Sequence, residues 1–515
     1  MSPGVRGLGI ALCGAALLAS GQDASAVNIL RRAPPGGAPP ASPSDPAAAA
    51  AARAQAAALQ ANGPLRRALE AIRQWQAAQD AARAAAQAGP ADVPNGLGPG
   101  GLELAPGMPP IGASDPSQTA RDGRIAVTVT QSQPRAILSW NTFNVGRETD
   151  VHFDQTAGGD NASSWVALNR VVDPNAAPSR ILGSIKAEGQ VYIINRNGII
   201  FGGTSQVNVG SLVVSGLDIA GPTLDQRNQR FLSGTLFDLS FAGPAGPVTV
   251  EAGAQLGAAD SGRVVLLGGR VVNGGSIEVP DGQVILAAGS TISLGMAPDL
   301  SAVRGLAPPV VSEGGLVDNS GIVSAPRGNI TLVAADTRQD GMLTATTGGQ
   351  ANGSIYLGAD GFTTTFGPGS VTQVLPDLNG KKVVGSVDFR KSRVEAHGDQ
   401  IDVLDGATLY VPSGDVSLSA VMTKDPRTDP AQVGTDDTRV YIGSGARIDV
   451  SGLLGVEVPM EQNTIRAELR ANELRDDPLL RNNPALRGQS IWFDGRLGVN
   501  GQVADVSGYY DLIAR

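Results

Sequence analysis

Short runs in which apolar and polar residues alternate make up most of the chain between about residues 122 and 450. Ile125, Val127 and Val129 alternate with small or polar residues, as a half-buried β-strand requires. Gly, Asn and Asp separate one run from the next, and these residue types favour tight turns. The pattern therefore predicts many short strands that are connected by tight turns.

A strand–turn unit of about 20–25 residues recurs in this region, which is the length of one turn of a parallel β-helix. Residues 273–288 read NGGSIEVPDGQVILAA, and residues 319–335 read NSGIVSAPRGNITLVAA. Residues 406–420 form a looser copy of the unit. The same rhythm is found in residues 203–217, 262–267 and 443–450.

Stacking explains why such a unit would recur. One turn cannot bury its inward apolar residues alone, whereas stacking on the next turn buries them and pairs backbone groups at about 4.8 Å per layer. Asparagines at equivalent corners can add ladders of side-chain amides. We therefore predict an all-β fold, a right-handed parallel β-helix. A β-sandwich is the alternative, but it would not need a near-identical repeat of this period.

Composition supports this fold class and narrows the partners. The 515 residues include 68 Gly and 34 Pro but only 4% aromatic residues, which suits small residues stacked in layers better than a core of bulky side chains. The hydrophobic content of 42% argues against disorder. The net charge of −9 argues against nucleic acid as a partner.

The first 26 residues resemble an export signal. They combine Arg6, an apolar run and a small-x-small cleavage site that ends at Ala26, as a secretory signal peptide does. The single cysteine, Cys13, lies inside this signal. A lipoprotein signal at Cys13 is the weaker interpretation, because the bulky Leu12 precedes it. A mature chain cleaved after Ala26 would contain no disulfide.

Residues 27–121 are rich in Ala, Pro and Gly and are predicted to form helices and linkers. Residues 62–64 (Asn-Gly-Pro) should divide the Ala-rich part into two helices, and we interpret it as a spacer. A helix that packs on a partner or lies on a surface is the alternative, because Leu65, Leu69, Ile72 and Trp75 recur at helical spacing. Since the apolar content is mostly Ala, we expect this extension not to dock on the β-helix.

The strand pattern divides the rest of the chain in two. We predict a first β-helix domain at residues 122–395, and further β-helix repeats with a helical insertion at residues 461–475 in residues 396–515. Solenoids need polar caps, and the chain stops at Arg515 without one. We therefore expect the sequence to be a piece of a longer protein.

A group of motifs between residues 140 and 219 is more specific than the repeat. They read WNTFNVG from Trp140, VHFDQ from Val151, ALNRVV from Ala167, PSRILGSI from Pro178 and GQVYIINRNGIIFG from Gly189. Their order and spacing resemble the haemagglutination-activity domain of filamentous haemagglutinin-type exoproteins, the secreted members of two-partner secretion systems. Residues 231–234 and Phe237 continue the resemblance.

This resemblance implies a set of site residues. The secretion motif would be Asn195, Arg196, Asn197, Gly198 and Ile199, in which Arg196 replaces the family's usual proline. The supporting motif residues are Trp140, Phe143, Phe153, Asn169, Arg170, Ser179, Gly183, Phe201 and Gly202. The residues alone predict a tight turn between two buried strands at 195–198. Whether its asparagines only cap the turn, or also guide docking or early folding, stays open.

The resemblance also implies a route and partners. The chain would enter the periplasm, be recognised by a cognate outer-membrane barrel transporter, cross it unfolded and stack into a β-helix outside. It would act as an adhesin, secreted or at the bacterial cell surface, with ligands on host or neighbouring cells. No cofactor and no metal are expected.

Candidate catalytic chemistry is sparse. The two histidines, His152 and His397, lie far apart in the sequence, and no HExxH, CxxC or GxSxG motif occurs. Asp399, Asp402 and Asp405 could suggest the acidic metal site of a polysaccharide-cleaving β-helix, although solvated turn acids explain them better. We therefore predict a protein that is not an enzyme. The alternatives are such a polysaccharide-cleaving enzyme and the N-terminal secretion part of a contact-dependent toxin whose effector lies beyond residue 515.

Overall fold

A computed structural model divides the chain into two units. Unit 1 comprises Met1–Leu378 and Arg390–Leu454, and unit 2 comprises Asn379–Phe389 and Gly455–Arg515. The signal predicted at residues 1–26 lies outside the described residues, and for residues 46–62 and all of unit 2 only the backbone is described. The described residues are 46–90, 92–173, 177–234, 236, 239–297, 305–312, 314–347, 353–359, 361–376, 392–421, 438–452, 464–468, 490–499 and 502–505.

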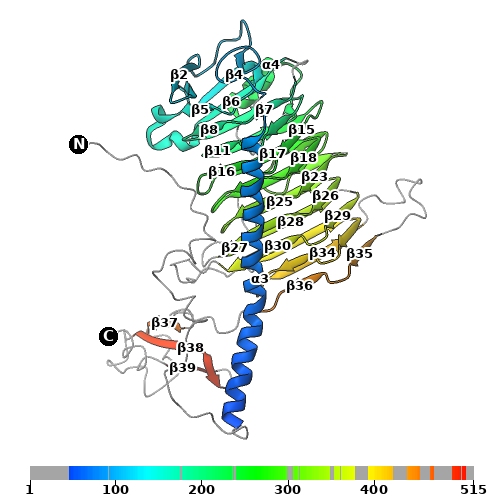
Figure 1. Ribbon diagram of the computed structural model, residues 1–515. Coiled ribbons are helices and arrows are strands. Elements are labelled where there is room, and N and C mark those ends of the chain that lie inside the picture. The colour runs from blue at the N-terminus through cyan, green and yellow to red at the C-terminus, as the bar shows by residue number, and fades with distance from the viewer. Residues whose placement is uncertain are drawn as a thin grey trace, which may run out of the picture. The chain divides into compact units, whose positions relative to one another are not determined.

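Unit 1 contains the predicted parallel β-helix, in which each coil contributes strands to three long sheets (Figure 1). We call them sheets A, D and C, in the order in which a coil such as β9–β10–β11 visits them. Sheet A consists of β1 (Leu102–Leu104), β4 (Arg135–Phe143), β6 (Val166–Val171), β9 (Gln190–Ile194), β12 (Ser211–Ser215), β17 (Arg263–Gly268), β20 (Gln283–Ala288), β25 (Asn329–Ala334), β28 (Ser354–Ala359), β31 (Arg393–Gly398) and β34 (Asp415–Ala420).

The other two sheets complete each coil. Sheet D consists of β7 (Ser179–Ile181), β10 (Ile199–Phe201), β15 (Pro247–Val250), β18 (Arg270–Asn273), β23 (Leu316–Asn319), β26 (Asp336–Gln339), β29 (Thr363–Phe366), β32 (Gln400–Val403) and β35 (Arg439–Ile442). Sheet C consists of β2 (Ser117–Arg121), β3 (Arg124–Thr130), β5 (Thr149–Asp154), β8 (Ser184–Ala187), β11 (Gln206–Val209), β16 (Gln255–Ala258), β19 (Ser276–Glu278), β24 (Ile322–Ala325), β27 (Met342–Thr347), β30 (Val371–Pro376), β33 (Thr408–Tyr410) and β36 (Arg447–Asp449).

The middle strands of sheet A are buried on both faces, unlike β31 and β34 at its end. All six residues of β6, β20 and β25 are buried, whereas β5 and β18 alternate between buried and more exposed residues. The outer face of sheet A is covered by two segments that leave the β-helix, one between β12 and β15 and one between β20 and β23, which we call together the excursion. The excursion consists of α4 (Leu224–Ser233) and an antiparallel sheet of β13 (Asp218–Ile219), β14 (Ser240–Ala242), β21 (Thr291–Ser293) and β22 (Val310–Ser312).

The repeat identified in the sequence stacks in register. Asn273 in β18 lies beside Asn319 in β23, which lies beside Gln339 in β26. The Asn273 side chain donates to Asn319 Oδ1 at 2.7 Å, and the Asn319 side chain donates to Gln339 Oε1 at 2.6 Å. All three residues are fully buried. The predicted amide ladder is therefore confirmed.

Glycines at the corner before sheet A allow successive coils to stack closely and do not supply a positive φ. Gly and Asn are expected at corners in general because the backbone there needs left-handed or bulged geometry. At the corner before sheet A it is the residue before the glycine that has a positive φ, as in Asp281 (52°) and Arg327 (53°). A Cβ on Gly282 would lie 2.1 Å from the Gly262 oxygen, and one on Gly328 would lie 2.3 Å from the Gly282 oxygen. Close stacking of successive coils, not φ, therefore requires glycine at these positions.

The N-terminal extension differs most from its prediction. Residues 89–120, the Pro- and Gly-rich end of the extension, were expected to be a linker, but β1 and β2 pair antiparallel with β4 and β3 at the start of sheets A and C. The first coil is thereby covered, which protects its strand edges. The first strand that pairs in parallel is β3, which begins at Arg124, so β1 and β2 are a cap that precedes the coils.

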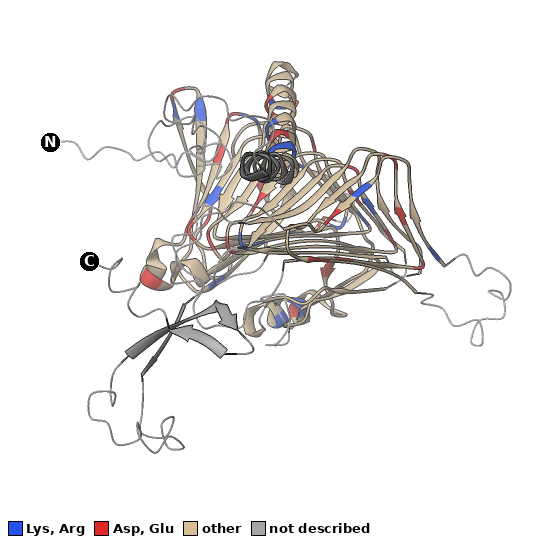
Figure 2. Ribbon diagram, turned by 90° about the horizontal axis from the view of Figure 1, so that it is seen from below, with Lys and Arg blue, Asp and Glu red and all other residues tan. Residues whose placement is uncertain are grey.

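The expected pair of helices is a single helix, α3 (Pro46–Ala88), which contains Pro64. It does not remain separate, because Leu65, Ala68 and Ile72 pack against Leu375 and Tyr410 of the β-helix. Figure 2 looks along the β-helix and shows α3 outside the sheets. Tertiary packing that starts beside Pro64 overrides the local signal for a break. The expectation that the extension would not dock on the β-helix is therefore wrong.

Unit 2 contains one antiparallel sheet of β37 (Thr464–Glu468), β38 (Ser490–Val499) and β39 (Gln502–Asp505). The helical insertion predicted at residues 461–475 is therefore wrong for residues 464–468, which form a strand. The rest of that predicted helix lies outside the described residues.

The amide ladder leads to a test of coil stacking. Asn319→Leu should lower the free energy of unfolding by about 2–5 kcal/mol, because the buried Asn273 side-chain N–H loses its Asn319 acceptor and the buried Gln339 Oε1 loses its Asn319 donor. Urea denaturation of the purified protein measures the effect. Asn161→Leu, the same change at an exposed position, is the control and should change little. Equal midpoints for the two variants would show that the ladder does not stabilise the fold.

Candidate functional site

The motif residues lie in several places on successive coils, not around one cleft. Trp140, Phe143, Phe153, Asn169 and Phe201 are buried in the interior of the β-helix. The Trp140 and Phe143 rings meet edge to face at 5.3 Å, and the indole N–H of Trp140 donates to Asn169 Oδ1 at 3.1 Å. These residues therefore belong to the core, and Trp140 and Asn169 satisfy each other's buried polar groups.

Asn195 ties three coils together at the corner between sheets A and D. Its backbone N–H donates to the Ser215 carbonyl of the following coil at 3.0 Å. Its side-chain amide donates to Ser179 Oγ of the preceding coil at 3.0 Å and to the Ala177 carbonyl at 3.4 Å. Asn195 and Ser179 are both only 1% exposed. The corner is therefore held by buried hydrogen bonds that run along the stack.

The side chain of Asn195 also shapes the turn itself. Its Oδ1 accepts hydrogen bonds from the Asn197 backbone N–H at 2.9 Å and the Asn197 side chain at 3.1 Å. Gly198 has a φ of 113°, and neither asparagine has a positive φ. We expected residues 195–198 to form a tight turn, and they do. The asparagines act through side-chain hydrogen bonds, and the glycine supplies the backbone conformation.

Arg196 differs from the other four residues of this segment because it is exposed. Ile199 is fully buried at the start of β10, and Gly198 is buried against Pro247 of the next coil. The turn therefore exposes the Arg196 side chain to solvent beside the hydrogen-bonded residues Asn195 and Asn197.

Gly183 and Gly202 lie at the opposite end of sheet D, where the chain turns into sheet C. A Cβ on Gly183 would lie 2.2 Å from the Thr149 oxygen, and one on Gly202 would lie 2.3 Å from Leu182 Cδ2. Gly183 therefore needs glycine for close stacking of coils, as the corner before sheet A does, because the two nearest atoms that a Cβ would meet belong to the backbone. At Gly202 the atom that a Cβ would meet is the end of a leucine side chain.

Arg170 points out of sheet A and fastens the excursion to the β-helix. Its Nε donates to Asp218 Oδ1 at 3.0 Å, and its Nη1 donates to Asn228 of α4. Asp218 Oδ2 also accepts from Arg227 at 2.5 Å. The side chains of Arg170 and Asp218 are only 2% and 6% exposed. Burial lowers the pKa of Arg170, and the carboxylate of Asp218 opposes this shift.

Phe231 of α4 is the apolar anchor of the same excursion. It is fully buried, and its ring meets Tyr192 of sheet A edge to face at 5.9 Å. The guanidinium of Arg135 lies 5.4 Å from the Phe231 ring centre and donates to the Phe231 carbonyl at 2.6 Å. The resemblance pointed to residues 231–234 without indicating a helix, and this helix places Phe231 on sheet A.

Sequence reasoning missed Asp218 and Asn228, which bind Arg170, and Arg227, which also binds Asp218. One signal could have revealed the helix that contains Arg227 and Asn228, because Thr223 followed by Gln226 has the spacing of a capping box. In the structure Thr223 Oγ1 accepts from the Gln226 backbone N–H at 3.2 Å. The pairing of Arg170 with Asp218 has no such signal, since the two residues meet only after the excursion folds back.

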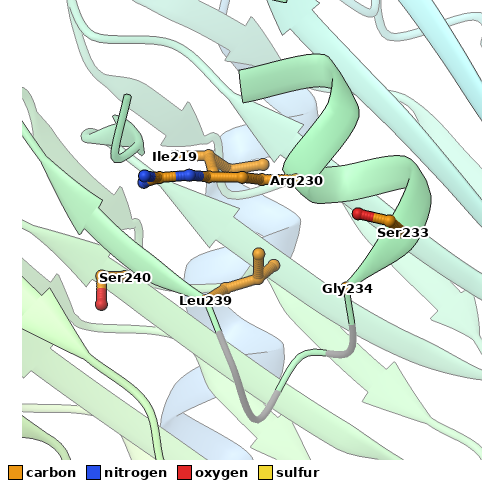
Figure 3. A pocket seen from close by; sticks show the side chains of 6 residues that line it. All are labelled: Ile219, Arg230, Ser233, Gly234, Leu239 and Ser240. Carbon is orange, nitrogen blue, oxygen red and sulfur yellow. The ribbon is translucent and has the colours of Figure 1, made fainter. Parts of the chain in front are cut away.

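The excursion also contains a cavity of about 210 Å³ (Figure 3). It is lined by Ile219, Arg230, Ser233, Gly234, Leu239 and Ser240. Arg230 Nη1 donates to the Ala220 carbonyl, and Ser240 Oγ lies 3.0 Å from Ser293 Oγ. The lining polar groups are therefore engaged in holding the excursion together.

The candidate catalytic acids are spread over one coil. Asp402 lies 3.5 Å from Arg439, and Asp405 accepts from the Ser444 backbone N–H at 2.8 Å in a turn. His152 lies 2.8 Å from Glu188 on the outer face of sheet C. In the part of the chain that the structure describes, no three acidic, His or Cys side chains are grouped to hold a metal ion.

None of the helices within the described ranges combines the length and the apolar character needed to span a bilayer.

Comparison with known proteins places these features in context. The family model described as the TPS secretion domain matches residues 113–355. Two heme/hemopexin-binding proteins of Haemophilus influenzae are 30% and 36% identical over 105 and 93 residues, which are 20% and 18% of this chain. These matches span only 11% and 10% of the relatives' own lengths.

Two solved secretion domains are also similar. The HMW1 secretion domain from Haemophilus influenzae is 21% identical with a TM-score of 0.49, covering 68% of this chain and 84% of that chain. The filamentous hemagglutinin secretion domain is 15% identical with a TM-score of 0.32, covering 68% of this chain and 100% of that chain.

The buried ion pair of the excursion can be tested directly. Asp218→Asn should lower the free energy of unfolding by about 3–5 kcal/mol, because it leaves the buried Arg170 guanidinium without its charged partner. Asp225→Asn, at an exposed position in the first turn of α4, is the matched control. Urea denaturation of both variants measures the difference, and a loss no larger than that of the control would contradict the structural role of Arg170.

Proposed function

Because this chain is a filamentous haemagglutinin-type exoprotein of two-partner secretion, with its TPS secretion domain at residues 113–355, we propose that a cognate outer-membrane transporter recognises this domain and that the exported chain acts as an adhesin. The single observation that carries the proposal is the match of residues 113–355, which includes the corner at residues 195–199 and the α4 excursion. A secreted protein with such a domain requires a transporter partner. The proposed adhesin role depends on the resemblance to filamentous haemagglutinin-type exoproteins and concerns the whole exported protein.

The fold suits export through a narrow pore. The chain has one cysteine, Cys13, which lies within the predicted signal, so no disulfide would have to form or open during passage. Each coil gains its hydrogen bonds and its apolar contacts from the coil before it, as β9 does from β6 and β12 does from β9. A chain that emerges progressively can therefore add coils one at a time, with β1 and β2 covering the first coil.

Within the domain, we assign the corner at residues 195–199 two separable roles. Asn195, Asn197 and Gly198 build the turn and connect neighbouring coils, which is a role in folding. Arg196 makes the turn's exposed, charged surface, which is suited to contact with a transporter. The replacement of the family's usual proline by Arg196 would then give this chain a charge with which to discriminate its own transporter from others.

The experiment separates recognition from folding. Arg196→Glu should reduce the amount of extracellular protein severalfold when the chain is expressed with its transporter, because it reverses the charge on the exposed turn. The thermal midpoint of the purified variant should stay within about 2 °C of the parent protein, since exposed substitutions rarely change stability much. Immunoblots of culture medium and cell fractions measure export.

Two controls complete the experiment. Arg121→Glu makes the same charge reversal in the β2–β3 hairpin, where the side chain is 89% exposed, and should leave export unchanged. Asn195→Ala should reduce both export and thermal stability. Unchanged export of Arg196→Glu would reject recognition through this turn, and loss of export from every variant that keeps its stability would point to a role elsewhere in the domain.

A further inference from the structure

Helix α3 contacts coils that are far apart in the stack. At one end of the contact, Pro64 and Ala68 of the helix lie against β30, against Tyr410 of β33 and against Arg447 of β36. At the other end, a Cβ on Gly203 would approach Ala86 Cβ to 2.7 Å. The distance along the helix from Pro64 to Ala86 is about 33 Å, and the six strand spacings from β33 back to β11 amount to about 29 Å. The helix therefore matches this part of the stack in length.

Polar contacts fix the position of α3 along the stack. Gln79 uses both ends of its side-chain amide, accepting from the Gly253 N–H at 2.9 Å and donating to the Gly274 carbonyl at 2.8 Å. Arg83 donates to the carbonyls of Thr204 at 3.1 Å, Gly253 at 3.0 Å and Ser205 at 3.3 Å. Three successive corners between sheets D and C thus share two side chains of one helix. These backbone groups belong to three different coils.

The end of the helix is held by a cation. Arg147, from the corner before β5, donates to the carbonyls of Ala86, Gln87, Gly89 and Pro90 at 3.0–3.1 Å. A guanidinium at this position pairs the last free carbonyls and complements the negative end of the helix dipole. The helix is therefore attached at its C-terminal end to one of the first coils, while Pro64 and Ala68 lie on the last coils.

This arrangement has two consequences for a repetitive fold. In a solenoid each coil is stabilised only by its neighbours, so distant coils open independently. A helix bound at both ends connects them, because opening of one end weakens the binding of the other. The helix also precedes the β-helix in the chain but packs at Pro64 and Ala68 on coils that come last in it. We call the surface of the β-helix that α3 contacts, from residues 203–205 to β33 and Arg447, the seat of the helix. The seat is complete only after residues 408–449 have stacked.

We propose that α3 is a clamp that closes only after the last coils have formed and that then couples the stability of the first and last coils of its seat. The coupling is mutual, since each end of the clamp raises the affinity of the other end by the same factor. The clamp explains why the Ala-rich helix carries Gln79 and Arg83 on its inner face. This proposal does not depend on whether a transporter recognises the corner at residues 195–199.

The test uses hydrogen exchange of the full-length protein. The double variant Gln79→Ala/Arg83→Ala removes the contacts to the corners at residues 204–205, 253 and 274. If α3 is a clamp, exchange in β33 and β36 should rise by about tenfold, because the loss of two or more hydrogen bonds weakens the helix along its whole seat. The matched control is Gln74→Ala/Arg73→Ala, which changes the same residue types on the exposed face of the same helix.

The reciprocal measurement starts at the other end. Tyr410→Ala removes packing at Ala68 and should raise exchange of the Gly253 N–H, which donates to Gln79 and lies five strand spacings away. Faster exchange at the distant end in both experiments supports the clamp. If exchange in β33 and β36 is the same in the Gln79/Arg83 variant and its control, or if Tyr410→Ala leaves Gly253 unchanged, the proposal is overturned. Neither readout depends on export, so failure of the proposed function would leave it intact.

Discussion

The stacking of each coil on the next is the constraint on which the rest of the structure depends. A buried polar group costs free energy unless it finds a hydrogen-bond partner, and inside this β-helix the partner lies in a neighbouring coil. Asn273 is satisfied by Asn319, which is satisfied by Gln339. Asn195 is satisfied by Ser179 before it and Ser215 after it. Correct register is therefore enforced by side chains as well as by the sheet ladders.

The same constraint explains why the motif residues are so diverse. Trp140 and Asn169 pair inside the core, Gly183 allows coils to approach at a corner, and Arg170 reaches outward to Asp218. Each of these residues either allows neighbouring coils to stack or attaches the excursion that covers sheet A. The exposed part of the motif is reduced to Arg196, which stands on a corner made rigid by its buried neighbours. A surface of this kind can be recognised without a deep pocket.

The excursion and α3 add contacts that a simple solenoid lacks. The excursion covers the outer face of sheet A, so that β6, β20 and β25 are buried on both faces. Helix α3 runs along the corners between sheets D and C and on the outer face of sheet C. Both elements fasten several coils at once. We therefore expect the coils in the middle of this β-helix to unfold more cooperatively than they would if each coil were stabilised only by its neighbours.

The sequence by itself determined the repeating architecture, because alternating apolar residues and the repeats at residues 273 and 319 report local needs that every coil shares. It also located the turn at residues 195–198, whose Asn and Gly residues have local turn chemistry. Residues far apart in the chain decided the rest. The ion pair of Arg170 and Asp218 forms because the excursion folds back over sheet A. The single docked helix through Pro64 forms because Leu375 and Tyr410 lie under it, and no pattern within residues 46–88 could have shown that surface.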